Sequence, residues 1–594
     1  MSHLEKYIRE LRECHRLGHE TSFYGKLETL INEIGKELSP KVKCIINPKN
    51  VNSNFPDGGF FTENQIRNLT IDISTLGWGG PTPERGVLEV KTFDKDVRVI
   101  AGSEQVSNYL GDYGQVLVTN YWDFLVVGKD INGNQSNLEQ YSLATDKIAF
   151  WEGTNSPKKF SQMHEKSFTE YIKRTLLCVT ELTDPKTVAW LLASYARDAL
   201  ERLNDADISD IKDIREKLQA FLGISFDGER GEHFFRSTLI QTIFYGVFAA
   251  WVIWSRGKHS ARGSMTDRFD WMATGFKLQV PVLKRLFGLV ATGSNLETFK
   301  LTEILDWTGN ALNRVNRDDF FQTFENEHAV QYFYEPFLEA FDPTLRKDMG
   351  VWYTPREIVE YMVERVDRVL RDELDEPEGL ASGRVYVLDP CCGTGAYLVE
   401  VLRRIEKTIK ERGEDALSGE EIKKAAINRI IGLEILPASY VISHMEVSLF
   451  VRSVGSSFSN DERPAIYLTN ALTGWEADKI PDQIATDRMF KMEWEAATSI
   501  KRDKPILVVL GNPPYNGFAG VSLDEEGGLI EHYKQGLVDQ WGIKKFNMDD
   551  LYIRFFQIGR AQNCRDDWLR RSLLYLQFLL FERTFLCRYA SEFA

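Results

Sequence analysis

One stretch of the sequence decides the fold class: Val385-Tyr386-Val387-Leu388-Asp389-Pro390-Cys391-Cys392-Gly393-Thr394-Gly395. Its first residues are mostly apolar and predict a buried strand, and a helical pattern over residues 396–410 follows at once. The glycines between strand and helix allow a ligand to approach the backbone at the carboxyl end of the strand, where doubly wound α/β folds bind nucleotides. The stretch lacks the third glycine of a dinucleotide-binding loop, so alone it is a weak signal.

Three further apolar segments predict strands of the same sheet. They lie at residues 430–434, 466–470 and 506–510. The first of them ends in Glu434, an acid well placed to accept hydrogen bonds from two ribose hydroxyls. The segments therefore predict a doubly wound, Rossmann-like core with a nucleotide-containing ligand at its carboxyl edge.

The last strand leads into the tetrapeptide Asn512-Pro513-Pro514-Tyr515. Two consecutive prolines restrict the backbone and hold the Asn512 and Tyr515 side chains in one geometry. A carboxamide and a nearby backbone carbonyl can accept the two hydrogens of an adenine amine, and Tyr515 can stack on a flipped base. A plain proline-containing strand exit is the alternative, and the glycine turn at residues 393–395 favours the first interpretation.

Together these segments resemble the N6-adenine, or amino, DNA methyltransferases. The resemblance implies S-adenosylmethionine as cofactor and Asn512, Pro513, Pro514 and Tyr515 as catalytic residues. It also implies an extra cofactor motif at residues 350–357, in which Thr354 contacts the cofactor; Thr354 could equally be the N-cap of the helix expected over residues 355–370. Many relatives place an acid where this chain has Asn470. The implied cofactor-binding residues are Thr354, Asp389, Cys391, Gly393, Gly395, Glu434 and Asn470.

A second pattern near the amino end points to a different chemistry. Asp57 follows a proline, and Glu89 and Lys91 alternate in the apolar segment 87–91. Side chains two residues apart in a strand project from the same face, so Glu89 and Lys91 should meet, and Asp57 can complete a two-carboxylate site. Such oxygen ligands suit Mg²⁺, and a lysine can help to activate water at a phosphodiester. Asp57 and Glu89 are the predicted metal ligands.

A helix after this segment strengthens the nuclease hypothesis. Gln105 and Tyr109 share one helix face, and this Q-x-x-x-Y pattern is similar to one branch of the PD-(D/E)xK nuclease superfamily. Gln105 is therefore a candidate catalytic residue together with Asp57, Glu89 and Lys91. Glu33, in the helix expected over residues 27–38, resembles the first acidic position of the superfamily, although it could simply be a solvated side chain.

A nuclease joined to an adenine methyltransferase resembles the type ISP-like and type IIG restriction–modification enzymes. We expect a PD-(D/E)xK nuclease-like domain at 1–150, a helical coupler at 151–340 and a methyltransferase core at 341–559. The expected partner is double-stranded DNA. The sequence contains no G-x-x-x-x-G-K-[ST] loop, so ATP is not expected.

Bulk properties indicate a large cytoplasmic enzyme. No apolar run approaches a membrane span, and the amino terminus is too charged for a secretory signal. The 7 cysteines are an odd number without metal spacing, which fits a reducing compartment. The net charge of −15 argues against non-specific coating of DNA, so binding must rely on local basic patches or on a missing part of the protein.

Beyond residue 559 the family pattern stops. Back-translation with permitted codons, read one nucleotide later, recovers a segment over residues 560–578 that resembles the next family motif. The sequence therefore predicts an out-of-frame tail at 560–594, an incomplete methyltransferase core without a target recognition domain, and little or no sequence-specific methylation by the chain as written. A genuinely divergent tail is the alternative. Two other functions stay open: a non-catalytic remnant, and a methyltransferase that acts on RNA or protein.

Overall fold

The computed structural model describes residues 1–17, 23–38, 40–46, 56–67, 82–129, 133–177, 182–204, 208–256, 268–275, 285, 288, 301–326, 333–343, 354–413, 418–459, 461–473, 479–514 and 554–555. The chain divides into two compact units. The first comprises Met1–Asp205, Trp254–Trp271 and Phe299–Phe341, and the second comprises Ala206–Ile253, Met272–Thr298 and Asp342–Ala594. Residues 560–594, the predicted out-of-frame tail, lie outside the described residues.

The first unit contains a six-stranded sheet in the order β1-β2-β3-β4-β5-β6. Only β3 and β4 are parallel; every other neighbouring pair is antiparallel. Two short helices, α4 (Val97–Ala101) and α5 (Glu104–Tyr113), connect this parallel pair. The strands are β1 (Val42–Ile46), β2 (Gly58–Thr62), β3 (Val87–Val90), β4 (Val116–Thr119), β5 (Asp123–Lys129) and β6 (Gln135–Ser142).

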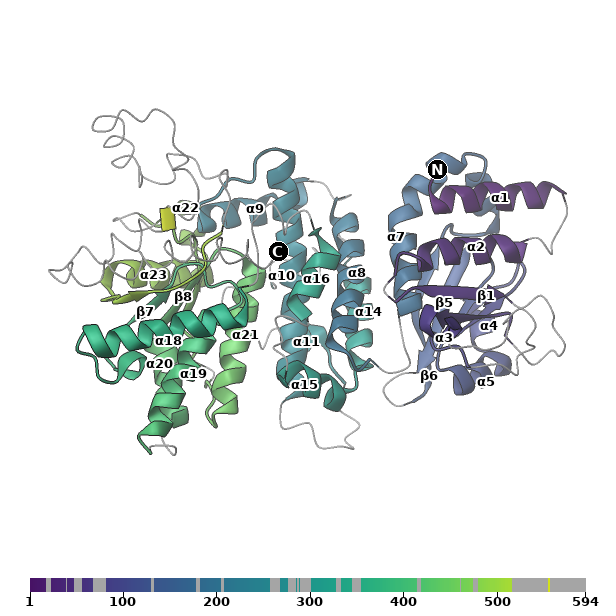
Figure 1. The fold of residues 1–594 in the computed structure, drawn as a ribbon. Coiled ribbons are helices and arrows are strands. Elements are labelled where there is room, and N and C mark those ends of the chain that lie inside the picture. The colour runs from purple at the N-terminus through teal and green to yellow at the C-terminus, as the bar shows by residue number, and fades with distance from the viewer. Residues whose placement is uncertain are drawn as a thin grey trace, which may run out of the picture. The chain divides into compact units, whose positions relative to one another are not determined.

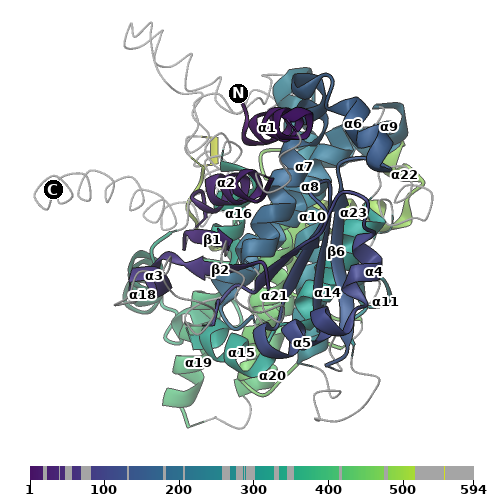
Figure 2. The ribbon, with the colours of Figure 1, turned by 90° about the vertical axis from the view of Figure 1, so that its right-hand side faces the viewer.

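Both faces of this sheet are covered, because alternate side chains of its central strands enter two different cores. Leu88 and Leu117 join one cluster, whereas Val87, Val116 and Val118 join the other. The first cluster is covered by α1 (His3–Leu17), α2 (Phe23–Gly35) and α7 (Pro157–Leu177), and the second by α4 and α5. Figure 2 shows α1 and α2 on one side of the strands and α5 on the other.

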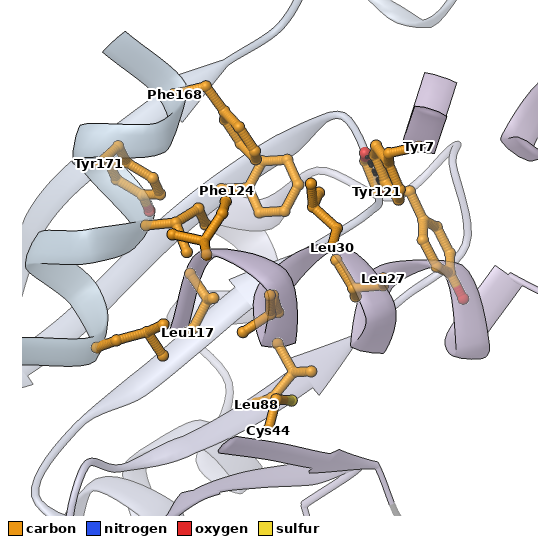
Figure 3. Close-up of a cluster of buried hydrophobic side chains, with 14 of the residues drawn as sticks. Tyr7, Leu27, Leu30, Cys44, Leu88, Leu117, Tyr121, Phe124, Phe168 and Tyr171 are labelled. Atoms are coloured by element: carbon orange, nitrogen blue, oxygen red, sulfur yellow. Dashed lines mark hydrogen bonds between the residues drawn. The ribbon is translucent and has the colours of Figure 1, made fainter. Parts of the chain in front are cut away.

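Aromatic rings fill much of the larger cluster (Figure 3). Phe124 and Phe168 meet edge to face with ring centroids 5.0 Å apart. The hydroxyl of Tyr7 donates to the carbonyl of Tyr121 at 2.8 Å, so the one polar atom of that buried ring is satisfied. The remaining helices of the first unit are α3 (Glu63–Arg67), α6 (Lys147–Gly153), α8 (Pro185–Asn204), α14 (Thr302–Asn313), α15 (Arg317–Asn326) and α16 (Glu335–Phe341).

The expectation that no apolar run approaches a membrane span is wrong for one helix. Helix α10 (Gly228–Ser255) contains an 18-residue window with a mean hydropathy of 1.4, which passes the test for a membrane span by length and composition. However, 89% of that window is buried inside the protein, and a buried core helix passes the same test. The neighbouring elements in the chain are α9 (Ile208–Leu222) and α11 (Trp271–Gly275).

The second unit contains a four-stranded, fully parallel sheet in the order β10-β7-β8-β9. Its strands are β7 (Val387–Asp389), β8 (Ile430–Glu434), β9 (Ile466–Leu468) and β10 (Val508–Val509), which lie within the four predicted segments. The chain passes outward from β7 to β9 and then returns to pair β10 with the other side of β7. Strand order therefore reverses at β7, and such switch points are where open α/β sheets bind ligands.

Helices cover both faces of this sheet, giving the mixed α/β architecture visible in Figure 1. On one side lie α19 (Ala396–Glu411), α20 (Ser418–Asn428) and α21 (Pro437–Ser453), and α18 (Arg356–Glu373) packs on α19. On the other side, Ile500 of α23 (Arg488–Asp503) joins Leu388, Ile431 and Leu433 in one cluster. The shorter elements are α22 (Asp482–Ala485) and the 3₁₀ helix η5 (Gly379–Ala381).

Candidate functional site

The parallel sheet brings four predicted residues to one edge. Asp389 ends β7, Glu434 ends β8, and Asn470 and Asn512 follow β9 and β10. Since the four strands are parallel, these positions line the same carboxyl edge in the order Asn512, Asp389, Glu434, Asn470. Asp389 and Asn512, which are more than 120 positions apart in the chain, therefore lie at the same switch point.

Asn512 and Thr354 are in direct contact. The Asn512 amide nitrogen donates to the Thr354 hydroxyl oxygen at 3.0 Å, across 158 positions of sequence. Thr354 is not the N-cap of α18, because Pro355 occupies that position and makes no side-chain cap. The predicted cofactor contact and the predicted catalytic amide therefore belong to one constellation, along with Pro513 and Pro514. Tyr515 lies outside the described residues, as do most of residues 550–557.

The glycine turn after β7 is held in a conformation that favours glycine. Gly393 and Gly395 have φ values of 54° and 89°. A Cβ built on Gly393 would meet nothing within 4 Å, so open space borders the backbone there. The Glu434 carboxylate accepts from the backbone N–H groups of Gly393 at 2.8 Å, Ile435 at 2.9 Å and Leu436 at 2.8 Å. Burial nevertheless raises the pKa of Glu434.

Asp389 is buried beside this turn. One carboxylate oxygen accepts from the backbone N–H of Cys391 at 3.1 Å, and the other has no hydrogen-bond partner among the described residues. Burial raises the pKa of Asp389 to about 8. Burial also raises the pKa of the half-buried Cys391 thiol.

Gly511 is a site residue that the sequence analysis missed. A Cβ at this position would lie 2.4 Å from an Asp389 carboxylate oxygen, so only glycine lets β10 continue past that carboxylate into the Asn512 turn. The sequence feature that could have identified Gly511 is its position directly before the tetrapeptide of residues 512–515.

These residues fit an S-adenosylmethionine molecule. Two buried polar atoms at the edge, an Asp389 carboxylate oxygen and the Asn470 amide nitrogen, have no partner among the described residues, and a polar ligand would satisfy them. The open backbone at Gly393 and the acid at the end of β8 have the positions that a nucleoside requires.

In the first unit the predicted carboxylates also come together. Asp57 directly precedes β2 and Glu89 lies on the neighbouring strand β3, next to the paired residues Gly58 and Leu88. The Asp57 carboxylate accepts from the backbone N–H of Val90 at 2.8 Å. Lys91 forms an ion pair with Glu89, as the strand alternation predicted.

Glu89 is buried and only partly hydrogen-bonded. It is 1% exposed, and one of its carboxylate oxygens has no hydrogen-bond partner among the described residues. Burial first, and then the nearby Asp57 charge, raise the pKa of Glu89 to about 7. The described residues contain no group of three or more His, Cys, Asp or Glu arranged to hold a metal. Two carboxylates with water fit Mg²⁺, which keeps several waters and is often bound by only one or two carboxylates.

Two tyrosine hydroxyls lie near these carboxylates. Gln105 donates to the Tyr109 hydroxyl at 2.8 Å, and the pKa of Tyr109 is raised to about 12, mainly by burial. Tyr24 on α2, which the sequence analysis missed, donates to Asp57 at 3.4 Å. Glu33 does not join the site: its carboxylate pairs with Lys36 at 2.6 Å on the surface of α2.

Comparisons with known proteins agree with part of these predictions. Residues 325–523 match the N-6 DNA Methylase family model. The methylase subunit of the type I restriction enzyme EcoEI from Escherichia coli is 23% identical over 243 residues, which cover 40% of this chain and 44% of that protein. This chain therefore spans less than half the length of its curated relative.

Two solved structures that show some similarity to this chain contain DNA or a DNA mimic. A DrdV–DNA complex has a TM-score of 0.43 and 17% identity. The match covers 95% of this chain and 49% of the DrdV chain. A nuclease-deletion mutant of the type ISP enzyme LlaGI, in complex with a DNA substrate mimic, has a TM-score of 0.47 and 18% identity. The match covers 68% of this chain and 30% of the LlaGI chain. Residues 325–523 of this chain are thus similar in sequence to the N-6 DNA methylase family.

Proposed function

We propose that this chain, once its reading frame is restored near residue 559, methylates the N6 amine of adenine in double-stranded DNA, with S-adenosylmethionine as the methyl donor, in a restriction–modification system. The observation that carries the proposal is the contact between Asn512 and Thr354 at the switch point of a parallel sheet. It joins the residue expected to hold the target base to the residue expected to contact the cofactor. A Rossmann-like methyltransferase core is the finer fold assignment that goes with this function.

Each residue of the edge has a defined task in this proposal. The Asn512 carboxamide oxygen and the Pro513 carbonyl accept from the adenine amine, and Tyr515 stacks on the flipped base. Glu434 binds the ribose hydroxyls, and Gly393 leaves the backbone open to the ligand. The sulfonium of the bound cofactor supplies an already activated methyl group, so the protein contributes mainly by positioning the amine.

The experiment is methyl transfer by Asn512→Ala in a protein whose reading frame is restored near residue 559. We expect the loss of several orders of magnitude in transfer to DNA and little change in cofactor affinity, because this side chain acts on the base. Nucleoside mass spectrometry of treated DNA identifies the product, and Asn428→Ala, on the surface of α20, is the matched control. Formation of 5-methylcytosine in place of N6-methyladenine contradicts the mechanism. Cofactor binding without transfer to any DNA would favour the non-catalytic remnant.

We further propose that the first unit cleaves DNA in a Mg²⁺-dependent reaction. The supporting observation is the convergence of Asp57, Glu89 and Lys91, with one Glu89 oxygen buried and unsatisfied among the described residues. Asp57 and Glu89 would hold the cation and Lys91 would orient a water near the phosphodiester. A nuclease in the same chain also favours DNA over RNA or protein as the methylation substrate.

Asp57→Ala tests the nuclease. Nicking of unmethylated plasmid in Mg²⁺ should disappear, whereas Asp94→Ala, an exposed acid in the loop after β3, should cleave as the wild type does. Cleavage that persists when Asp57, Glu89 and Lys91 are all replaced would show that the activity comes from elsewhere.

A further inference from the structure

Helix α2 carries a polar stripe made of Tyr24, Glu28 and Asn32. Residues four apart on a helix lie on the same side of it, so the three side chains form one row. The Asn32 carboxamide donates to the Cys44 carbonyl at 3.0 Å and accepts from the Cys44 N–H at 2.7 Å. The Glu28 carboxylate accepts from the N–H of Ile46 at 3.3 Å. Two members of the stripe therefore fix α2 along β1, an edge strand of the sheet.

The third member of the stripe contacts the proposed cation site. The Tyr24 hydroxyl donates to one carboxylate oxygen of Asp57 at 3.4 Å, and the backbone N–H of Val90 donates to the other at 2.8 Å. Each oxygen of this carboxylate thus has one donor, and the pair of donors restrains its rotation. A carboxylate oxygen has a second acceptor position, so both oxygens can still bind a cation.

A strained residue holds the ring of Tyr24 from the side. Tyr121, in the turn between β4 and β5, has a φ of 78°, which is uncommon for a residue other than glycine. Its N–H donates to the Thr119 hydroxyl at 3.0 Å, and its carbonyl accepts from the Tyr7 hydroxyl at 2.8 Å, so hydrogen bonds stabilise this conformation. The rings of Tyr121 and Tyr24 meet edge to face, with centroids 6.4 Å apart and an angle of 81°. Backbone strain of this kind is concentrated at functional sites.

The second carboxylate of the site is oriented by a different partner. One oxygen of Glu89 pairs with the Lys91 ammonium, and the other has no hydrogen-bond partner among the described residues. Two carboxylates can share one cation only if both present an oxygen to the same point. Lys91 orients Glu89, and the donors on Asp57 are Val90 and Tyr24.

We propose that Tyr24 is a positioning residue of the cation site: its hydroxyl holds Asp57 in the orientation in which Asp57 and Glu89 bind one divalent cation. This inference rests on the proposed nuclease function and adds a residue that the PD…ExK and Q-x-x-x-Y patterns do not include. Loss of a hydrogen bond to a metal-binding carboxylate typically lowers metal affinity by about 10–100-fold. We expect the lower end of that range, about tenfold, because 3.4 Å is long for an O–H···O hydrogen bond.

Tyr24→Phe in the full chain tests this role, because it removes the hydroxyl and keeps the ring that packs on Tyr121. Electron paramagnetic resonance measures the binding of Mn²⁺, used in place of Mg²⁺, without DNA, and binding that persists in Asp57→Ala is subtracted. The Mn²⁺ affinity should fall about tenfold. In plasmid nicking, the Mg²⁺ concentration that gives half the maximal rate should rise by a similar factor, whereas the rate at saturating Mg²⁺ should stay nearly unchanged.

Tyr141→Phe is the matched control. Tyr141 on β6 is half-buried against the same hydrophobic cluster as Tyr24, and its hydroxyl is hydrogen-bonded to His164 at 3.1 Å. This variant should keep the wild-type Mn²⁺ affinity, and equal weakening in both variants would assign the effect to core packing and overturn the inference. An unchanged Mn²⁺ affinity in Tyr24→Phe with a lower maximal nicking rate would also overturn it, because the hydroxyl would then act on the DNA. If the wild type has no Mn²⁺ binding that depends on Asp57, the proposed cation site itself is wrong.

Discussion

At the scale of single residues, both candidate sites contain groups that burial disfavours. Glu89 and Asp389 have pKa values raised to about 7 and about 8, and each keeps one carboxylate oxygen without a partner among the described residues. Such groups reduce the stability of a protein without ligand. Perturbed pKa values of this kind cluster at functional sites, which agrees with the proposed cation and cofactor sites.

His444 on α21 gives a prediction for pH dependence. Burial, and then the nearby Arg463 charge, lower the pKa of His444 to about 3, and its ring is hydrogen-bonded to the Ile466 carbonyl at 3.2 Å. The ring is thus neutral in the folded protein but gains a proton below about 6.5 when unfolded. Its stabilisation is complete above that pH and decreases as the pH falls from 6.5 toward 3. At pH 5 the loss is about 2 kcal/mol.

Urea denaturation at pH 7 and pH 5 measures this effect. His444→Gln should lose about 2 kcal/mol less than the wild type between the two pH values, although it is less stable at pH 7. An identical pH dependence in both proteins would show that the neutral imidazole is not responsible.

Some site residues could be predicted from the sequence because local rules place them. Side chains alternate along a strand, so Lys91 and Glu89 project from the same face and can pair. Asp389 and Glu434 end parallel strands, so they lie at the carboxyl edge of the sheet. The contact of Asn512 with Thr354 could not be predicted in this way, because it depends on β10 returning to pair with β7.

At the scale of elements, one buried ion cluster connects a strand to two helices. Arg174 on α7 donates to Glu139 on β6 at 3.0 Å and to Asp198 on α8 at 3.2 Å. Arg174 and Asp198 are each 2% exposed. Hydrophobic periodicity predicts that these helices form, but it does not predict the carboxylates with which a buried arginine pairs. This ion cluster could therefore be identified only from the structure.

We expect Arg174→Ala to destabilise the first unit by about 3–5 kcal/mol, because it leaves the buried Glu139 carboxylate without its cation and removes one of the cations that pair with Asp198. Lys166→Ala is the matched control on the same helix: its exposed ammonium pairs with Glu201 at 2.9 Å and should contribute less than about 1 kcal/mol. Equal effects of the two substitutions in chemical denaturation would contradict a structural role for the cluster.

At the scale of the whole molecule, the chain is organised as two compact units that are each assembled from separate segments. The helices within residues 151–340 contribute to both units. An amphipathic pattern predicts that one face of a helix is buried, but it does not predict the element against which that face packs. The sequence therefore could not predict which unit each of these helices joins. The role of residues 151–340 as a coupler stays a prediction.

The division into two units leads to a prediction about ligands. The proposed cation site lies within the first unit and the proposed cofactor site within the second. A ligand that binds only folded protein stabilises it by about 2.7 kcal/mol at a concentration 100 times its Kd. In calorimetric unfolding of the full chain, Mg²⁺ should therefore raise the transition of the first unit, and S-adenosylhomocysteine that of the second. Glu89→Gln should abolish only the Mg²⁺ response, because it removes a ligand charge, and Glu434→Ala only the cofactor response, because it removes the ribose acceptor and the clamp on Gly393. If each variant abolished both responses, the two sites would not be independent, and the assignment of one ligand to each unit would be wrong.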